Sequence, residues 1–218
     1  AELARDGVEP ARIHVTGIPV ESVFEHPPLK AAARARLGLR PDGHHVLVMG
    51  GGNGLGLAAD DVLAVEETEG VDGVVVITGC NERLAGAIGR LPVTPGKERR
   101  VLSMVHEIEQ YYAAADILVS KPGGLTMSEA TAMSMPIIMI APLPGQELRN
   151  AEFLLRSGAA LMASGTSTLQ ALVSRLIAHP KERASLARAA RGVGRPEASG
   201  RIASLALEMA VGAGTVAR

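Results

Sequence analysis

The stretch that most constrains the fold is residues 116–152, where two short apolar runs are each followed by a turn and a helical pattern. Ile117–Ser120 and Pro136–Ile140 have the length and composition of strands buried on both faces, which are typical of parallel sheets. The helices that follow are expected over Thr126–Ser134 and Gln146–Leu155. Both helices therefore begin at the carboxyl ends of neighbouring strands, which is the edge where open α/β sheets bind ligands.

Two features of this edge fit a nucleotide. Free backbone N–H groups in the Lys121–Gly124 turn and at the helix start suit an anion such as a diphosphate. Glu129 lies about one turn into the helix, where its carboxylate can accept two hydrogen bonds from a vicinal diol such as that of a ribose. Taken alone, Glu129 is better explained as a solvated acid that interacts with the helix dipole.

The same alternation continues along the chain, with further apolar runs at 46–49, 74–78, 101–103 and 158–162 and helical patterns between them. This order predicts an α/β fold with a Rossmann-like, doubly wound parallel sheet. The run at 46–49 leads into Gly50–Gly56, GGGNGLG, which is not a P-loop because no Lys-Ser/Thr pair follows. A nicotinamide site would need an acidic residue at the end of the next strand. Gly79 and Cys80 stand there instead, so no cofactor is predicted.

Composition excludes several classes of protein. The formal net charge of −1 argues against a nucleic-acid binder, and the apolar runs are shorter than the roughly 18–20 residues of a membrane span. Cys80 is the only cysteine, which fits a reducing compartment, and no signal peptide opens the chain. The six histidines are dispersed without zinc spacing. The sequence therefore predicts a cytoplasmic protein without a metal site.

The motifs KPGGLTMSEA at 121–130, PGQELRNA at 144–151 and GGGNGLG at 50–56 resemble the donor-nucleotide signature of the family 28 glycosyltransferases. The resemblance extends from about Ile13 to Leu161. The best fit is to the glycerolipid branch, which contains the monogalactosyldiacylglycerol synthases and the processive diacylglycerol glucosyltransferases. It implies the GT-B architecture, in which two Rossmann-like domains face each other across a cleft. The C-terminal half then binds a UDP-sugar and the N-terminal half binds the lipid acceptor.

The resemblance also implies a division of the chain. Residues 1–20 would hold the inter-domain connection and a first strand at Ile13–Val15, residues 21–195 the UDP-sugar-binding domain, and residues 196–218 a helix that crosses to the N-terminal domain. The family's catalytic base is a histidine of that N-terminal domain, so no catalytic residue is assigned in this chain. The full-length parent is expected to lie peripherally on the inner face of the membrane.

Donor contacts are assigned by position in the family motifs. The backbone at Val105 would pair with the uracil and Glu129 would bind the ribose. Gln146 and Glu147 would contact the hexose hydroxyls, or in part the ribose. The family usually has an arginine just after the crossing point, where this chain has Glu21. The phosphate charge is then compensated by Lys121, by helix N-termini, or by nothing. The complete expected donor site is Gly51, Gly52, Asn53, Gly54, Val105, Lys121, Gly123, Gly124, Leu125, Thr126, Glu129, Gln146, Glu147 and Asn150.

The implied function is transfer of galactose or glucose from a UDP-sugar to a lipid, with diacylglycerol as the expected acceptor. One alternative is the lipid-II-forming N-acetylglucosaminyltransferase, which usually has two glutamines where this chain has Gln146 and Glu147. Another is a UDP-N-acetylglucosamine 2-epimerase, which shares the GT-B fold but not the PGQE element, and a third is a non-catalytic nucleotide-binding module. Tyr111 and Tyr112 are expected to pack on the sheet rather than to stack on the base.

Overall fold

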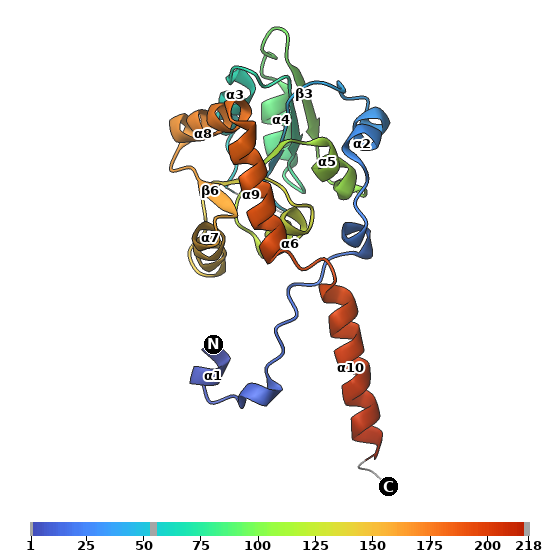
Figure 1. The fold of residues 1–218 in the computed structure, drawn as a ribbon. Helices are drawn as coiled ribbons and strands as arrows, with labels where there is room; N and C mark the ends of the chain where they lie inside the picture. The colour runs from blue at the N-terminus through green and yellow to red at the C-terminus, as the bar shows by residue number, and fades with distance from the viewer. Residues whose placement is uncertain (1, 53–55, 216–218) are drawn as a thin grey trace.

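The computed structural model describes residues 2–52 and 56–215 and contains a six-stranded parallel sheet (Figure 1). The strand order is β3-β2-β1-β4-β5-β6, which confirms the predicted doubly wound α/β fold. Each apolar run predicted from residue 46 onward forms a strand. The strands are β1 His45–Met49, β2 Gly73–Ile77, β3 Glu98–Leu102, β4 Ile117–Ser120, β5 Ile137–Met139 and β6 Ala160–Met162.

Helices cover both faces of the sheet, and alternate strand residues serve the two faces. Leu47 and Met49 of β1 belong to one apolar cluster, whereas Val46 and Val48 belong to the other. Helices α5, α6 and α7 pack into the first cluster, and α3, α4 and α8 into the second. The helices are α1 Glu2–Arg5, α2 Lys30–Leu37, α3 Ala59–Glu67, α4 Glu82–Gly89, α5 Ile108–Ala114, α6 Gly124–Ala132, α7 Gln146–Arg156, α8 Thr166–Ala178, α9 Pro180–Val193 and α10 Ala198–Thr215, with short 3-10 turns η1 Pro10–Arg12 and η2 Ser22–Glu25.

The start of α6 differs from the sequence-based expectation. The helix begins at Gly124 rather than at Thr126, because Gly123 is the extended N-cap and its carbonyl accepts a hydrogen bond from the Met127 N–H at 2.9 Å. The Gly123-Gly124 pair therefore forms the first turn of the helix itself. Free N–H groups at this helix start remain available for an anion.

The expected strand at Ile13–Val15 is wrong, since the structure assigns no regular element to residues 13–20. An extended segment becomes a strand only beside a partner, and Val15 is 82% exposed. The segment instead leads from α1 to the sheet domain and passes the start of α10, where the Ser199 hydroxyl donates to the Val20 carbonyl.

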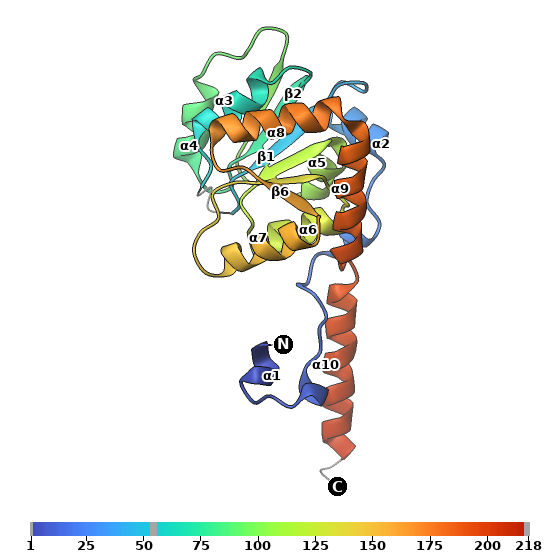
Figure 2. The ribbon, with the colours of Figure 1, turned by 60° about the vertical axis from the view of Figure 1, so that its left-hand side comes forward.

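Helix α10 and the first residues project away from the sheet domain on the same side (Figures 1 and 2). Leu207, Met209 and Val211 of α10 are each at least two-thirds exposed. Among the described helices, none combines the length and apolar character needed to cross a membrane.

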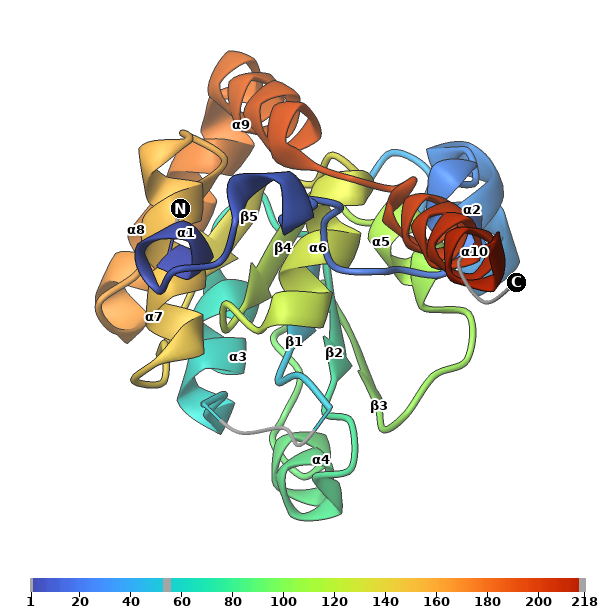
Figure 3. The ribbon, with the colours of Figure 1, turned by 90° about the horizontal axis from the view of Figure 1, so that it is seen from below.

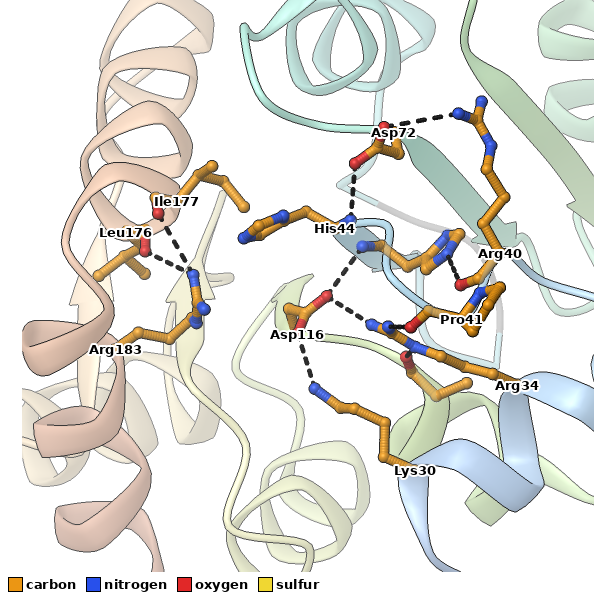
Figure 4. Close-up of polar contacts among 12 residues, drawn as sticks. Lys30, Arg34, Arg40, Pro41, His44, Asp72, Asp116, Leu176, Ile177 and Arg183 are labelled. Atoms are coloured by element: carbon orange, nitrogen blue, oxygen red, sulfur yellow. Dashed lines mark hydrogen bonds and ion pairs between the residues drawn. The ribbon is translucent and has the colours of Figure 1, made fainter.

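A buried polar cluster lies at the amino-terminal edge of the sheet, where the strands begin (Figure 4). The Asp116 carboxylate lies just before β4 and accepts hydrogen bonds from Arg34 at 2.8 Å, Lys30 at 2.7 Å and the His45 N–H at 2.9 Å. Arg34 also donates to the carbonyls of Ala114 and Pro41. These bonds attach α2 to the sheet and to α5 through the Arg34 side chain, which is almost completely buried.

Candidate functional site

The predicted site residues that the structure describes follow the carboxyl ends of β1, β3, β4 and β5. Figure 3 shows α6 between α5 and α7. Strands β1 and β4 are hydrogen-bonded neighbours, with Met49 opposite Ser120. The chain leaves β1 toward β2 on one side, while β4 and β5 lie on the other. The Gly-rich loop after β1 and the Lys121–Gly123 turn after β4 therefore flank the topological switch point, where such sheets bind ligands.

The Gly-rich loop is held against the end of β2. The Cys80 N–H donates to the Gly52 carbonyl at 2.9 Å, and the Gly50 N–H donates to the Ile77 carbonyl at 3.1 Å. Gly79, with φ of +61°, makes this approach possible, because a Cβ there would lie 2.4 Å from the Gly52 oxygen. Sequence reasoning missed Gly79. Asn53 and Gly54 lie outside the described residues.

Replacing Gly79 with alanine is expected to destabilise the protein by about 1–3 kcal/mol and to displace the Gly51–Gly52 backbone, because the new Cβ meets backbone atoms at a positive φ. Urea unfolding and UDP titration measure the two effects. Gly89→Ala is the matched control, since nothing lies within 4 Å of a Cβ there and the position ends a helix. Equal unfolding midpoints for both variants would contradict this account of the loop.

Lys121, just after β4, and Glu147, in the first turn of α7, form an ion pair that is largely shielded from solvent. The Lys121 ammonium lies 2.7 Å from Glu147 Oε1, and both side chains are 15% exposed. The other oxygen, Oε2, accepts the Leu143 N–H at 3.0 Å. The Lys121 side chain also runs beside Gly51, where a Cβ would lie 3.0 Å from the Lys121 Cε. Lys121 therefore places a cation beside the Gly-rich loop, but the Glu147 carboxylate already neutralises part of that positive charge.

The first turns of α6 and α7 are in contact. The Asn150 amide donates to the Pro122 carbonyl at 3.0 Å, and a Cβ at Gly124 would lie 3.4 Å from the Gln146 amide nitrogen. Ile18 of the connecting segment also packs at Gly124. A cavity of about 250 Å³ opens beside Gly124 and Asn150. The two signature motifs are thus one contiguous surface, with Leu125 exposed on it and Thr126 half-buried.

Glu129 is a perturbed carboxylate on α6. Its Oε2 accepts a hydrogen bond from the Tyr112 hydroxyl at 3.0 Å. Burial raises the pKa of Glu129 to about 7, although the Tyr112 hydrogen bond acts to lower it, and the Glu21 charge adds to the rise. The negative charge of Glu21, the position that departs from the family pattern, therefore contributes to the raised pKa of Glu129.

Val105 and Tyr112, two further residues considered in the sequence, are both at least partly buried. Val105 lies half-buried on the loop after β3 and packs against the apolar cluster shared with α5 and α6. Tyr112 is fully buried, which confirms that it packs on the sheet, but its hydrogen bond to Glu129 was not foreseen. No group of three or more His, Cys, Asp or Glu side chains converges as a metal site within residues 2–52 and 56–215.

Comparison with known proteins supplies the family. The family described as Glycosyltransferase family 28 C-terminal domain matches residues 45–202. A processive diacylglycerol beta-glucosyltransferase of Bacillus licheniformis is 31% identical over 181 residues, which are 83% of this chain and 47% of that protein. The Bacillus subtilis protein of the same description is 30% identical over 177 residues, or 81% of this chain and 46% of that one. The chain thus spans about half the length of these relatives.

Solved structures share the fold at lower identity. Acinetobacter baumannii MurG superposes with a TM-score of 0.60 at 21% identity, over 84% of this chain and 54% of that one. A UDP-GlcNAc 2-epimerase from Neisseria meningitidis, bound to UDP-GlcNAc, gives a TM-score of 0.69 at 16% identity, over 94% and 58% of the two chains. With a family match over most of its length and the GT-B half-fold, this chain belongs to glycosyltransferase family 28, of which it carries the C-terminal domain.

Proposed function

We propose that residues 21–195 are the UDP-sugar-binding domain of a hexosyltransferase that passes galactose or glucose from a UDP-sugar to a lipid acceptor, diacylglycerol. The observation that carries the proposal is Glu129, a half-buried carboxylate on the helix that begins at the switch point of the sheet. The similarity to diacylglycerol glucosyltransferases supports the choice of donor and acceptor. The Glu147 carboxylate, paired with Lys121, favours this branch over the alternative with two glutamines.

In this proposal each part of the donor has its own contact. The N–H groups of Gly51, Gly52 and the start of α6 bind the diphosphate, aided by the Thr126 hydroxyl and by the positive end of the helix dipole. Glu129 accepts the ribose hydroxyls, and the backbone at Val105 pairs with the uracil. Gln146, Glu147 and Asn150 face the hexose.

Charge stabilisation of the leaving diphosphate is the step that this domain would supply. As the bond from the anomeric carbon to the diphosphate breaks, negative charge grows on the phosphate oxygens, and preoriented N–H groups stabilise it without reorganisation. The base that accepts the proton of the acceptor hydroxyl is assigned to the N-terminal domain of the parent. Residues 1–20 and 196–218 would connect to that domain, and the exposed apolar residues of α10 fit a packed contact there. The parent would lie on the inner face of the membrane.

Binding and turnover test the proposal separately. Calorimetric titration of this chain should show binding of UDP and UDP-glucose and at least tenfold weaker binding of ADP. A transfer assay with radiolabelled UDP-hexose and diacylglycerol should show turnover by the full-length parent and none by residues 1–218. Equal affinity for ADP would argue against a uridine site. Turnover by the chain alone would place a base within it, with His106 as the first residue to replace.

Glu21→Arg is expected to tighten UDP binding several-fold and UMP binding less, because it replaces a carboxylate whose charge acts on Glu129 with the cation usual in the family. The same change should lower the pKa of Glu129, since it removes a negative neighbour. Glu25→Arg, a change at an exposed residue of the 3-10 turn that follows Glu21, controls for the change in net charge. If Glu21→Arg affects UDP and UMP equally, the residue does not reach the second phosphate.

A further inference from the structure

This protein has few aromatic side chains. Two of them pack against each other, and one of these two contacts Glu129. The sequence has two Phe, two Tyr and no Trp. Phe24 and Tyr112 are 2% and 0% exposed, and their rings meet edge to face with centroids 6.1 Å apart and planes at 73°. Phe24 belongs to η2, which directly follows Glu21, and Tyr112 belongs to α5.

Packing alone does not explain a tyrosine at this position, because a phenylalanine would fill the same space. A buried phenol requires a hydrogen-bond acceptor. The nearest acceptor is Glu129 Oε2 at 3.0 Å, and the Thr126 carbonyl lies farther away at 3.4 Å. Both acceptors belong to the first turns of α6, so among the described residues the hydroxyl donates to the helix that carries the proposed ribose ligand.

We propose that Tyr112 is a positioning residue for the nucleotide. Its hydroxyl fixes Glu129 Oε2, so that Oε1, which receives no hydrogen bond from the residues that the structure describes, is presented to the ribose. Phe24 holds the Tyr112 ring in place and links it to the segment that contains Glu21. This role rests on the proposed function, since it presupposes that Glu129 binds the ribose.

The charges around Glu129 give the proposal a distinctive pH dependence. Burial disfavours the ionised carboxylate and raises the pKa of Glu129 to about 7, the Tyr112 hydroxyl acts against this, and Glu21 adds to it. These are the titratable groups that act on Glu129 from α5 and from the start of η2. The pKa of Tyr112 itself is well above its usual value because of burial, so the hydroxyl stays a donor. Without that donor, the pKa of Glu129 should rise further.

The test uses Tyr112→Phe, which removes one oxygen and keeps the ring. Calorimetry from about pH 6 to 9 should show that UDP affinity in wild type rises as Glu129 ionises. The variant should bind UDP about tenfold more weakly near pH 7, with the midpoint of the rise shifted to higher pH. Ionisation of UDP is common to both proteins and cancels in the comparison. Tyr111→Phe, on the same helix and half-buried, should match wild type.

Two further variants separate the possible outcomes. Phe24→Leu, which loosens the ring without touching the hydroxyl, should weaken UDP binding less than Tyr112→Phe does. In a Glu129→Ala background, Tyr112→Phe should have no additional effect. If Glu129→Ala abolishes binding while Tyr112→Phe leaves affinity and pH midpoint unchanged, the positioning role is wrong and the proposed function stands. If wild type binds UDP and Glu129→Ala binds it equally well, the ribose role of Glu129 and the positioning role of Tyr112 are both wrong. If wild type does not bind UDP, the proposed function is wrong.

Discussion

Asp116→Asn is expected to lower the free energy of unfolding by about 3 kcal/mol, because removing one partner of a buried ion pair leaves the other charge uncompensated. The stranded charge is that of Arg34, whose side chain is 7% exposed. Lys30 is 47% exposed and contributes less, since water already solvates it. Urea unfolding at neutral pH measures the loss.

An exposed ion pair and the pH dependence provide the controls for Asp116. Glu182→Gln breaks the pair with Arg175, which is 53% exposed, and should cost at most about 1 kcal/mol. Burial alone would raise the pKa of Asp116, but Lys30, the His45 N–H and Arg34 together lower it. The stabilisation by Asp116 is therefore present above its unfolded pKa of about 4 and lost as the pH falls through the lower, folded value. A deficit in Asp116→Asn that persists at the lowest pH would contradict this assignment.

Glu129→Ala is expected to weaken UDP binding by about 2 kcal/mol, or roughly 30-fold, because two hydrogen bonds from the ribose to a charged acceptor are lost. Titration near pH 8, where the carboxylate is ionised, measures the effect at its largest. Glu107→Ala, a change at an exposed carboxylate on the loop before α5, is the control. An unchanged affinity in a folded Glu129→Ala protein would remove Glu129 from the site.

The same variant has a stability signature without ligand. The pKa of Glu129 is raised to about 7 in the folded protein, so the folded state keeps a proton that the unfolded chain has already lost. Wild-type stability should therefore fall as the pH rises from about 4.3 to about 7. Glu129→Ala should lack this fall, and parallel pH profiles for the two proteins would contradict the raised pKa.

The sheet was predictable because apolar runs such as those of β1 and β4 leave few alternatives to buried parallel strands. Strand β3 was only partly predicted, since the apolar run begins at Val101 and the charged residues Glu98, Arg99 and Arg100 precede it. The structure explains the difference: Arg99 is 2% exposed and pairs with the buried Glu66 at 2.7 Å. The predicted strand at Ile13–Val15 was wrong for a different reason. The segment is apolar and extended, but no strand of the described residues pairs with it.

The places of the glycines and of Glu129 in the fold were predictable, because local motifs fix them relative to the strands. Contacts that depend on the packing of distant elements were not. Tyr112 reaches Glu129 only because α5 and α6 lie on the same face of the sheet, and Lys121 meets Glu147 only because β4 and β5 are adjacent. No sequence pattern separates Gly79 from an ordinary turn glycine, since its role is a backbone approach to a different loop.

A crystal structure of this chain with bound UDP tests the central claim most directly. The account predicts both ribose hydroxyls within hydrogen-bonding distance of the Glu129 carboxylate, with the diphosphate against the N–H groups of Gly51, Gly52 and the start of α6. It also predicts the uracil beside the backbone of Val105. UDP bound away from α6, or with its ribose out of reach of Glu129, would contradict the account.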